Sequence, residues 1–323
     1  LELFMERVLK LPKKELEEEE IDQLVITLPS VTGKVMDSFL YCGDYLEIPR
    51  EKVHIISHEE SFVYYILNQK KEIWRNQVGL FDLSPNRLCY YELKVQRGLQ
   101  KMMVVAESFN LEESFDLDIL GTPSGARLAD KILCSCGERL LGRKLFSTII
   151  LSGKGFEKQD WSPEFMKLIC HRRKVYAETA LFSKGAAFRG AEYFEKKEES
   201  SFTCICEGRL KSTISMEVVY KDRKNQLVIA GAGENWYECR TSMDFILDDS
   251  KTVEFTVTPM DPKKKRRVVI SLKDFPDRPA RTTKIQMKIG FLDESTMVVA
   301  IRDLGFGELF PASDTIVRQE VKL

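Results

Sequence analysis

Short apolar runs alternate with segments of helical spacing in the first part of the chain. Leu24–Pro29 is a continuous apolar run ended by proline, which is typical of a strand buried in a parallel sheet. Gly33–Leu46 places its apolar residues on one side of a 3.6-residue period and predicts a helix. A second strand and helix follow, with a short strand at Val53–Ile56 and a helix that begins at Phe62. This order predicts an α/β arrangement with parallel strands.

A β-hairpin is predicted in the middle of the chain. Val78–Leu83 and Leu88–Leu93 are rich in residues that favour strands, and the four residues between them, Ser84-Pro-Asn-Arg87, favour a turn. Residues 101–106 predict a third strand of the same meander. A helical segment over 128–141 then leads to an apolar strand that ends at Gly153.

The pattern changes after about residue 200, where short alternating or β-branched runs recur without helices between them. Regularly spaced strands of this kind predict an antiparallel β-sandwich. We place the domain boundary in the polar stretch Glu195–Ser201. The expected strands cover 213–220, 225–229, 252–258, 267–272, 284–291 and 297–303.

Composition and charge exclude several classes of function. Lys and Arg number 49 against 50 Asp and Glu, so the overall charge does not favour nucleic acid or a membrane surface as a partner. No apolar run approaches the ~20 residues that cross a bilayer, and the first residues do not resemble a signal peptide, so we expect a cytoplasmic protein. We expect free structural thiols, with Cys42, Cys89 and Cys170 buried, and no metal site. The sequence does not predict the oligomeric state.

A basic stretch lies at Pro262–Arg267, between two expected strands. Such a stretch is similar to a nuclear localisation signal and would also attract phosphates. Because strands flank it on both sides, we expect a hairpin tip that contacts an acidic partner.

Several segments, in this order, resemble pieces of a known family: Leu24–Pro29, Val53–Ser61, Phe81–Leu83, Ile149–Phe156 and Ser183–Ala191. Together they look like the DnaK-type heat-shock chaperones and the wider group of actin-like ATPases. The resemblance implies an actin-like (ribonuclease H-like) α/β nucleotide-binding core, followed by an antiparallel β-sandwich like the chaperone substrate-binding domain. It assigns residues 1–77 to a partial first lobe, 78–195 to the second lobe and 196–323 to the sandwich. The chain opens on a predicted helix over residues 1–11 without an initiator Met, so the family's first phosphate hairpin is expected upstream of Leu1.

The resemblance also implies a nucleotide site. The family's second phosphate hairpin is an Asp-Leu-Gly-Gly-Gly-Thr type turn, whereas this chain has Asp82-Leu-Ser-Pro-Asn-Arg87, which keeps the Asp and loses the glycines. Pro85 also lacks an N–H that would face an anion. If ATP and magnesium are bound, the residues expected around them are Asp82, Ser84, Asn86 and Arg87 at the phosphates, Gly153, Lys154 and Gly155 at the adenosine, and Glu59 (or Glu60) at the attacking water.

Each of these motifs has a simpler interpretation. Ser84–Arg87 is also an ordinary hairpin turn, Glu59 suits a solvated helix N-terminus, and a short glycine turn after a strand is common in α/β folds. The roughly twenty residues between Ala106 and Leu128 are too few for the helical subdomain that covers adenine in chaperones. The sequence therefore predicts a degenerate chaperone-like scaffold that binds a peptide or protein partner, with weak or absent nucleotide binding. The alternatives are an active chaperone-like or filament-forming ATPase, in which Glu59 and Asp82 are catalytic, and an interaction protein without any ligand.

Overall fold

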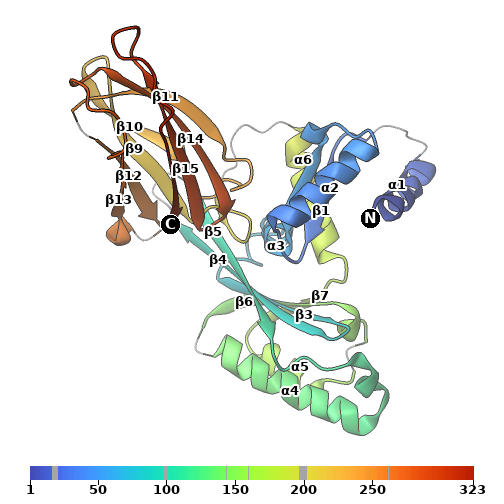
Figure 1. Cartoon of the computed structure of the whole chain (residues 1–323). Coiled ribbons are helices and arrows are strands. Elements are labelled where there is room, and N and C mark those ends of the chain that lie inside the picture. Colours follow the sequence, from blue (N-terminus) through green and yellow to red (C-terminus); the bar gives the residue numbers. More distant parts are fainter. Residues whose placement is uncertain are drawn as a thin grey trace. The chain divides into compact units, whose positions relative to one another are not determined.

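The computed structural model divides the chain into two compact units, Leu1–Glu207 and Gly208–Leu323 (Figure 1). We describe each unit by itself. The structure describes residues 1–16, 21–97, 101–142, 144–158, 160–195, 202–249, 251–260 and 262–323.

A parallel pair of strands lies near the start of the first unit. β1 (Leu24–Leu28) and β2 (Val53–Ser57) pair in parallel, with Leu24 opposite Val53, and α2 (Gly33–Tyr45) connects them. The predicted strands and helix are confirmed here. β1 is half-buried along its whole length, so the prediction that it is fully buried is wrong. The reason is that its sheet has only these two strands in the described part of the chain.

A mixed sheet forms the centre of the first unit. Within the described residues its strand order is β7-β6-β3-β4-β5-β8. The predicted meander is confirmed, because β3, β4 and β5 are successive antiparallel strands, and β6 pairs in parallel with β3 on the other side. β7 continues the sheet parallel to β6, and β8 lies parallel to β5. The bounds are β3 (Gln77–Ser84), β4 (Arg87–Arg97), β5 (Met102–Leu111), β6 (Phe146–Ser152), β7 (Lys174–Ala177) and β8 (Phe202–Ile205).

Helices cover both faces of this sheet, and the alternation of side chains along β3 shows which face each residue takes. Val78 and Leu80 join the hydrophobic cluster on the side of α3 and α6, whereas Phe81 and Leu83 join the cluster that includes residues of α4 and α5 (Figure 1). Asp82 and Ser84 alternate with Phe81 and Leu83 along the strand. Their side chains therefore lie on the opposite face, which α3 and α6 cover. The bounds of the helices in this unit are α1 (Glu2–Leu16), α3 (His58–Leu67), α4 (Pro123–Leu141), α5 (Pro163–Ile169) and α6 (Leu181–Phe194).

The second unit is a β-sandwich. Two antiparallel four-stranded sheets, β10-β9-β12-β13 and β11-β14-β15-β16, are found among its described residues, and both contribute to one hydrophobic core. Phe255 of β12 and Met287 of β14 are fully buried in that core. The six strands predicted from the sequence are confirmed, while β11 and β16 were not predicted. The bounds are β9 (Ser212–Tyr220), β10 (Arg223–Ala230), β11 (Thr241–Leu247), β12 (Thr252–Pro259), β13 (Arg266–Ser271), β14 (Thr283–Asp293), β15 (Thr296–Gly305) and β16 (Ile316–Lys322).

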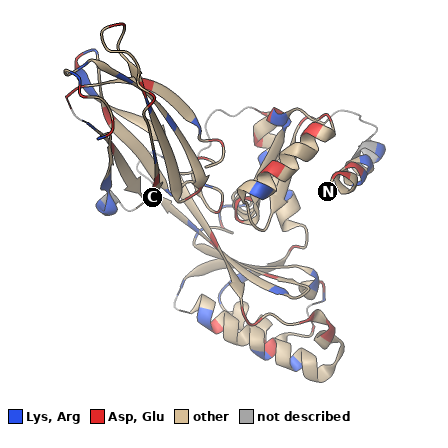
Figure 2. Ribbon diagram, in the orientation of Figure 1, with Lys and Arg blue, Asp and Glu red and all other residues tan. Residues whose placement is uncertain are grey.

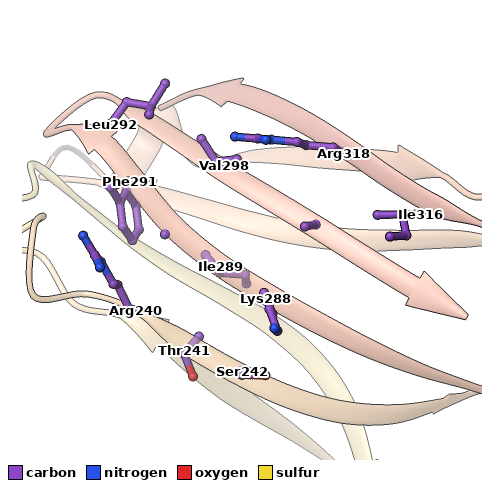
Figure 3. Close-up of a pocket in the computed structure, with 12 residues that line it drawn as sticks. Arg240, Thr241, Ser242, Lys288, Ile289, Phe291, Leu292, Val298, Ile316 and Arg318 are labelled. Carbon is purple, nitrogen blue, oxygen red and sulfur yellow. The ribbon is translucent and has the colours of Figure 1, made fainter. Parts of the chain in front are cut away.

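A hollow of about 620 Å³ lies over the sheet β11-β14-β15-β16 of this unit (Figure 3). Residues of all four strands line it, and Arg240 lines it from just before β11. The sequence analysis did not identify this surface.

The basic stretch forms the connection between β12 and β13. The 3₁₀ turn η4 (Pro262–Lys264) follows β12, and Val257 pairs with Arg266 at the start of β13. Figure 2 shows the Lys residues of this turn at the end of the two strands. The predicted hairpin tip is confirmed, and its acidic partner stays a prediction.

The two units divide between Glu207 and Gly208. Of the predicted boundary segment Glu195–Ser201, residues 196–201 lie outside the described residues. β8, which the sequence analysis placed with the sandwich, instead pairs with β5 in the sheet of the first unit. The subdivision into lobes at residues 77 and 78 stays a prediction.

All eight cysteines lie among the described residues, and none of them forms a disulfide. Cys42 and Cys89 are buried, as predicted, but Cys170 is exposed, because it follows the last turn of α5. In the described part of the chain, no helix is long and apolar enough to cross a lipid bilayer.

Candidate functional site

The turn between β3 and β4 is a tight two-residue turn. Ser84 pairs with Arg87, so that only Pro85 and Asn86 lie between the strands. Asn86 has a φ of 56°, a left-handed conformation that Asn tolerates better than most residues, and Pro before it fits a type II turn. The connection between β3 and β4 is therefore a short hairpin turn, and both of its residues are exposed.

Asp82 lies buried beside this turn. Its Oδ2 is 4.0 Å from the Arg87 guanidinium, and the Ser84 hydroxyl donates a 3.4 Å hydrogen bond to its Oδ1. Burial raises the pKa of Asp82, although the positive charge of Arg87 and the Ser84 hydrogen bond act in the opposite direction. The Arg87 guanidinium thus lies next to the Asp82 carboxylate, at the longest distance that counts as an ion pair.

Arg87 links Asp82 to a group of aromatic residues from β4, α3 and α6. Its guanidinium donates a 2.9 Å hydrogen bond to the Tyr91 hydroxyl, which is 3.4 Å from Nδ1 of His58. The His58 ring stacks on Phe182 with centroids 3.9 Å apart. Burial lowers the pKa of His58 to about 4, and the charge of Arg87 adds to this effect. His58 is therefore neutral near pH 7, and Arg87 supplies the positive charge of the group.

The glycine turn after β6 packs directly against this hairpin. Asp82 pairs with Ser152, and the next residue, Gly153, has a φ of 87°. A Cβ at Gly153 would overlap the carbonyl oxygen of Leu83 and lie 2.7 Å from Oδ1 of Asp82. A Cβ at Gly155 would overlap the Leu83 side chain, whereas Lys154 between the two glycines is exposed. The glycines here permit close packing of the loop on β3.

Glu59 points into a different environment. It is buried at the start of α3, and its carboxylate accepts a 2.6 Å hydrogen bond from the backbone N–H of Glu207. Burial raises its pKa, which the hydrogen bonds from Glu207 and Ser108 oppose. Within the described residues, the Glu59 carboxylate contacts Glu207 and Ser108 and not Asp82. The interpretation of Glu59 as a solvated helix terminus is wrong, because the helix N-terminus is covered.

The structure therefore brings part of the predicted site together. Asp82, Ser84, Arg87 and Gly153 are neighbours, and Gly155 lies beneath them against Leu83. Asn86 and Lys154 are exposed, and Glu59 is occupied elsewhere.

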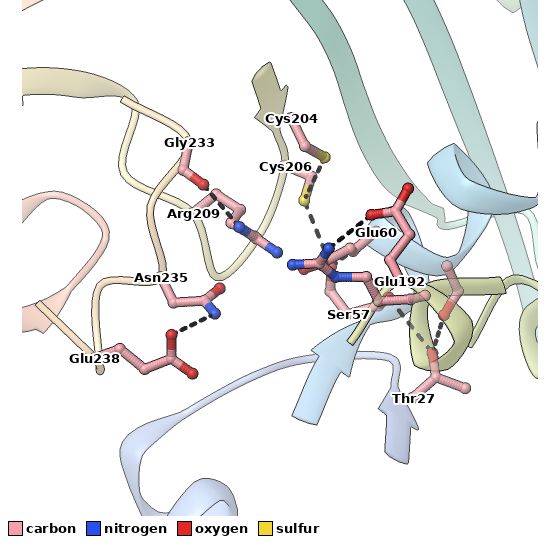
Figure 4. Close-up of polar contacts among 12 residues, drawn as sticks. Thr27, Ser57, Glu60, Glu192, Cys204, Cys206, Arg209, Gly233, Asn235 and Glu238 are labelled. Atoms are coloured by element: carbon pink, nitrogen blue, oxygen red, sulfur yellow. Dashed lines mark hydrogen bonds and ion pairs between the residues drawn. The ribbon is translucent and has the colours of Figure 1, made fainter. Parts of the chain in front are cut away.

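A second cluster, around Arg189 of α6, was not predicted, and Figure 4 labels its two acids, Glu60 and Glu192. The guanidinium of Arg189 lies 3.5 Å from the buried carboxylate of Glu60 and 2.9 Å from that of Glu192. It also lies over the rings of Tyr64 and Tyr193, at 4.9 and 4.1 Å from their centroids. The signal for this cluster in the sequence was the spacing of Arg189 and Glu192, which lie three residues apart on an apolar helix. The cluster fixes α6 to α3.

In the part of the chain that the structure describes, no group of three or more His, Cys, Asp or Glu side chains is placed to hold a metal ion.

Comparisons with known proteins give the following similarities. A model with the description "Domain of unknown function (DUF8552)" matches residues 209–323. No curated protein matches the chain at a significant level. A solved structure titled "Crystal structure of apo psk41 parM protein" is similar with a TM-score of 0.40 and 12% identity, over 61% of this chain and 72% of that one. A model with the description "Family of unknown function (DUF5716) C-terminal" matches residues 1–207, and the chain therefore belongs to this family.

Proposed function

We propose that the chain is a non-catalytic, actin-like scaffold that binds a peptide or protein partner, with weak or absent nucleotide binding. The order of strands supports the fold in this proposal. An antiparallel meander of β3, β4 and β5, extended by the parallel strands β6 and β7 beside β3, is the sheet expected for a lobe of an actin-like core.

The observation that carries the proposal is the position of Arg87 in front of Asp82. Phosphoryl transfer needs backbone amides near the phosphates, a carboxylate that anchors magnesium and a group that positions water. A guanidinium 4.0 Å from Asp82 opposes the approach of Mg²⁺ to the same carboxylate. The two-residue turn supports the proposal further, because Pro85 offers no N–H and the turn has no glycine that would let phosphates approach the backbone.

Glu59 adds a second argument of the same kind. A carboxylate that orients water needs its oxygens free for that water. In this chain the Glu59 carboxylate already accepts a 2.6 Å hydrogen bond from the Glu207 amide. Its role in the proposed scaffold is structural, because it joins the start of α3 to the segment after β8.

Isothermal titration of the full-length protein with magnesium ATP, paired with a phosphate-release assay, tests this proposal. We expect no turnover and at most weak binding. Asp118→Asn, which changes an exposed acid, is the control for Asp82→Asn. Micromolar binding with turnover that Asp82→Asn removes and Asp118→Asn leaves intact would reject the scaffold.

The alternative is an active chaperone-like or filament-forming ATPase, which needs an upstream first phosphate loop. Its supporting observation is that Asp82 is retained with Gly153 packed against it. In that case Arg87 would bind a phosphate. Nucleotide binding that Arg87→Ala abolishes would favour the ATPase, whereas binding that Arg87→Ala leaves unchanged or improves would not.

A further inference from the structure

The solvent-facing side of the sheet β11-β14-β15-β16 carries the hollow of about 620 Å³ in the second unit (Figure 3). Small residues form its floor, because Gly290 of β14 and Ala300 of β15 both line it. A Cβ at Gly290 would meet no heavy atom within 4 Å, so the space above this residue is open. We call this surface the sheet groove.

The strand register places three cations around this floor. Lys288 lies opposite Ala300 on β15, which in turn lies opposite Arg318 on β16. Arg240 comes just before Thr241, the residue that pairs with Ile289, and so lies beside Gly290. The cations therefore come from three different strands or their ends and flank the floor on the same face of the sheet (Figure 3).

The side chains of these cations have no partner in the part of the chain that the structure describes. Within the described residues, the side chains of Arg240, Lys288 and Arg318 are exposed and make no hydrogen bond or ion pair. By contrast, Lys284 on the same sheet pairs with Asp244 at 2.8 Å. No acidic residue is among the described residues that line the groove. Because the whole chain has a net charge of −1, the positive charge of the groove is a local concentration.

Two exposed acids lie close to the groove. Asp244 is two residues along β11 from Ser242, and it is already paired with Lys284. Glu320 of β16 is exposed and lies opposite Val298 of β15. It neutralises at most one of the three charges, so the groove stays positive.

Aliphatic side chains lie beside these cations. Leu292 and Ile316 are 51% and 57% exposed, and Val298 lines the groove between them. Exposed aliphatic groups next to unpaired cations fit a ligand that presents acidic and apolar side chains together on one face. A single strand of nucleic acid would instead need exposed rings for its bases. The ring that lines the groove, Phe291, packs against the hydrophobic core.

We propose that the sheet groove binds an extended, acidic peptide segment of a protein partner, with its carboxylates on Arg240, Lys288 and Arg318 and its aliphatic side chains on Leu292 and Ile316. This rests on the proposed function as a peptide-binding or protein-binding scaffold, and it names the surface and the chemistry of the partner. Four strands about 4.8 Å apart make a face roughly 15 Å wide, which an extended peptide of about six residues crosses.

Fluorescence anisotropy with the whole chain tests the proposal. The probe is a fluorescein-labelled peptide of about six residues, in which Glu and Leu take turns at every second position and Ser fills the positions between them, so that Glu and Leu share one face of the extended chain. The comparison probes replace Glu by Lys (the Lys-Leu peptide) or Leu by Ser (the Glu-Ser peptide). Labelled poly(U) RNA is the competing class of ligand. The charge variant is Lys288→Gln with Arg318→Gln, and its matched control is Lys265→Gln with Lys273→Gln, which removes two exposed cations of the same unit outside the groove. Gly290→Leu fills the open floor without touching a charge.

We expect the Glu-Leu peptide to bind, and the charge variant and Gly290→Leu each to weaken it about tenfold. The control variant should bind as the wild type does, and the Lys-Leu and Glu-Ser peptides should bind more weakly. Circular dichroism and the melting temperature show that each variant is folded. Failure of the Glu-Leu peptide to bind, equal binding of the Lys-Leu peptide, or binding that neither groove variant changes would overturn the proposal. Tighter binding of poly(U) with the same dependence on Lys288 and Arg318 would also overturn it.

These outcomes are separate from those of the nucleotide experiment. ATP turnover that depends on Asp82 would reject the non-catalytic scaffold and leave the peptide result unchanged. A negative peptide result with no ATP turnover would reject the groove alone.

Discussion

Arg278 and Asp303 form a buried, bidentate ion pair in the second unit, with both N–O distances at 2.8 Å. Their side chains are 6% and 0% exposed. Asp303 also accepts hydrogen bonds from the Gly305 amide at 2.8 Å and from the Ser313 hydroxyl at 2.6 Å. Burial alone would raise the pKa of Asp303, but the hydrogen bonds from Arg278, Ser313 and Gly305 outweigh it and hold the pKa well below its usual range. The pair joins β15 to the segments that precede β14 and β16.

Removing the charge of Asp303 should therefore destabilise the second unit. Asp303→Asn leaves Arg278 buried without a counter-ion, and breaking a buried pair in this way costs about 3–5 kcal/mol. Hydrogen exchange of the β14 and β15 amides in increasing urea measures the loss. Asp314→Asn changes an exposed acid on the connection between β15 and β16 and is the control. Its free energy of unfolding should stay within about 0.5 kcal/mol of the wild-type value. Equal effects of the two substitutions would contradict the assigned role.

The same pair predicts how the stability of the second unit depends on pH. A carboxyl whose pKa is lower in the folded state contributes stability that is fully present above its unfolded pKa, about 3.9 for Asp. That stability is lost as the pH falls toward the folded value, because protonation then accompanies unfolding. We expect the wild type to lose stability below about pH 5 more steeply than Asp303→Asn, and the two curves to run parallel above it. Urea unfolding at a series of pH values checks this, and parallel curves down to pH ~2 would contradict it.

Gly153 should be intolerant of substitution. Its φ of 87° is strained for any residue with a Cβ, and that Cβ would overlap the Leu83 carbonyl oxygen. Gly153→Ala is expected to destabilise the first unit by about 2–4 kcal/mol. Gly121→Ala is the matched control, because its Cβ meets nothing within 4 Å. Urea midpoints of the two variants measure the difference, and a neutral Gly153→Ala would show that the turn can rearrange.

Much of the fold could be predicted because many strands have a clear apolar pattern. Such a pattern is present in β1, β2, the β3–β4 hairpin and most of the sandwich strands. The starts of two helices were predicted too late, at Phe62 and Leu128. Their caps precede the apolar residues: Ser57 accepts a 3.1 Å hydrogen bond from the Glu60 amide, and Thr122 accepts one of 3.1 Å from Gly125. Ser57 with Glu60 is the capping-box spacing, so this signal was present in the sequence. By contrast, β7 is a short, largely exposed strand without an apolar alternation, and β16 alternates too weakly to stand out. β11 does alternate, with Met243, Phe245 and Leu247 at every second position, so its signal was present in the sequence and was missed.

The candidate sites depend on contacts that no local pattern contains. The partner of Glu59 is an amide 148 residues away, and nothing near Glu59 in the sequence indicates it. The neighbourhood of Asp82 and Gly153 follows from the register of β3 with β6, which pairs Asp82 with Ser152. The sheet groove likewise needs the register of β14, β15 and β16 before Lys288 and Arg318 fall on one row. Single residues could therefore be proposed from the sequence, whereas their groups required the tertiary structure.

Two glycines of α6 should respond in opposite ways to alanine. A Cβ at Gly185 would overlap the carbonyl oxygen of Ser61 and lie 2.6 Å from its carbonyl carbon, so that α6 and α3 would have to separate. A Cβ at Gly190 would meet only a methyl group of the Val25 side chain, at 3.3 Å. Gly185→Ala is expected to destabilise the first unit by about 2–4 kcal/mol, because a backbone atom cannot move aside without shifting its helix.

Gly190→Ala provides the internal comparison for this prediction. Alanine is favoured over glycine inside a helix by about 1 kcal/mol, which offsets a small shift of Val25 and leaves the variant near the wild-type stability. Hydrogen exchange of the α3 and α6 amides distinguishes the two cases, since only Gly185→Ala should open both helices together. If Gly185→Ala protected these amides as well as Gly190→Ala does, the helices would not be held at the backbone contact between Gly185 and Ser61.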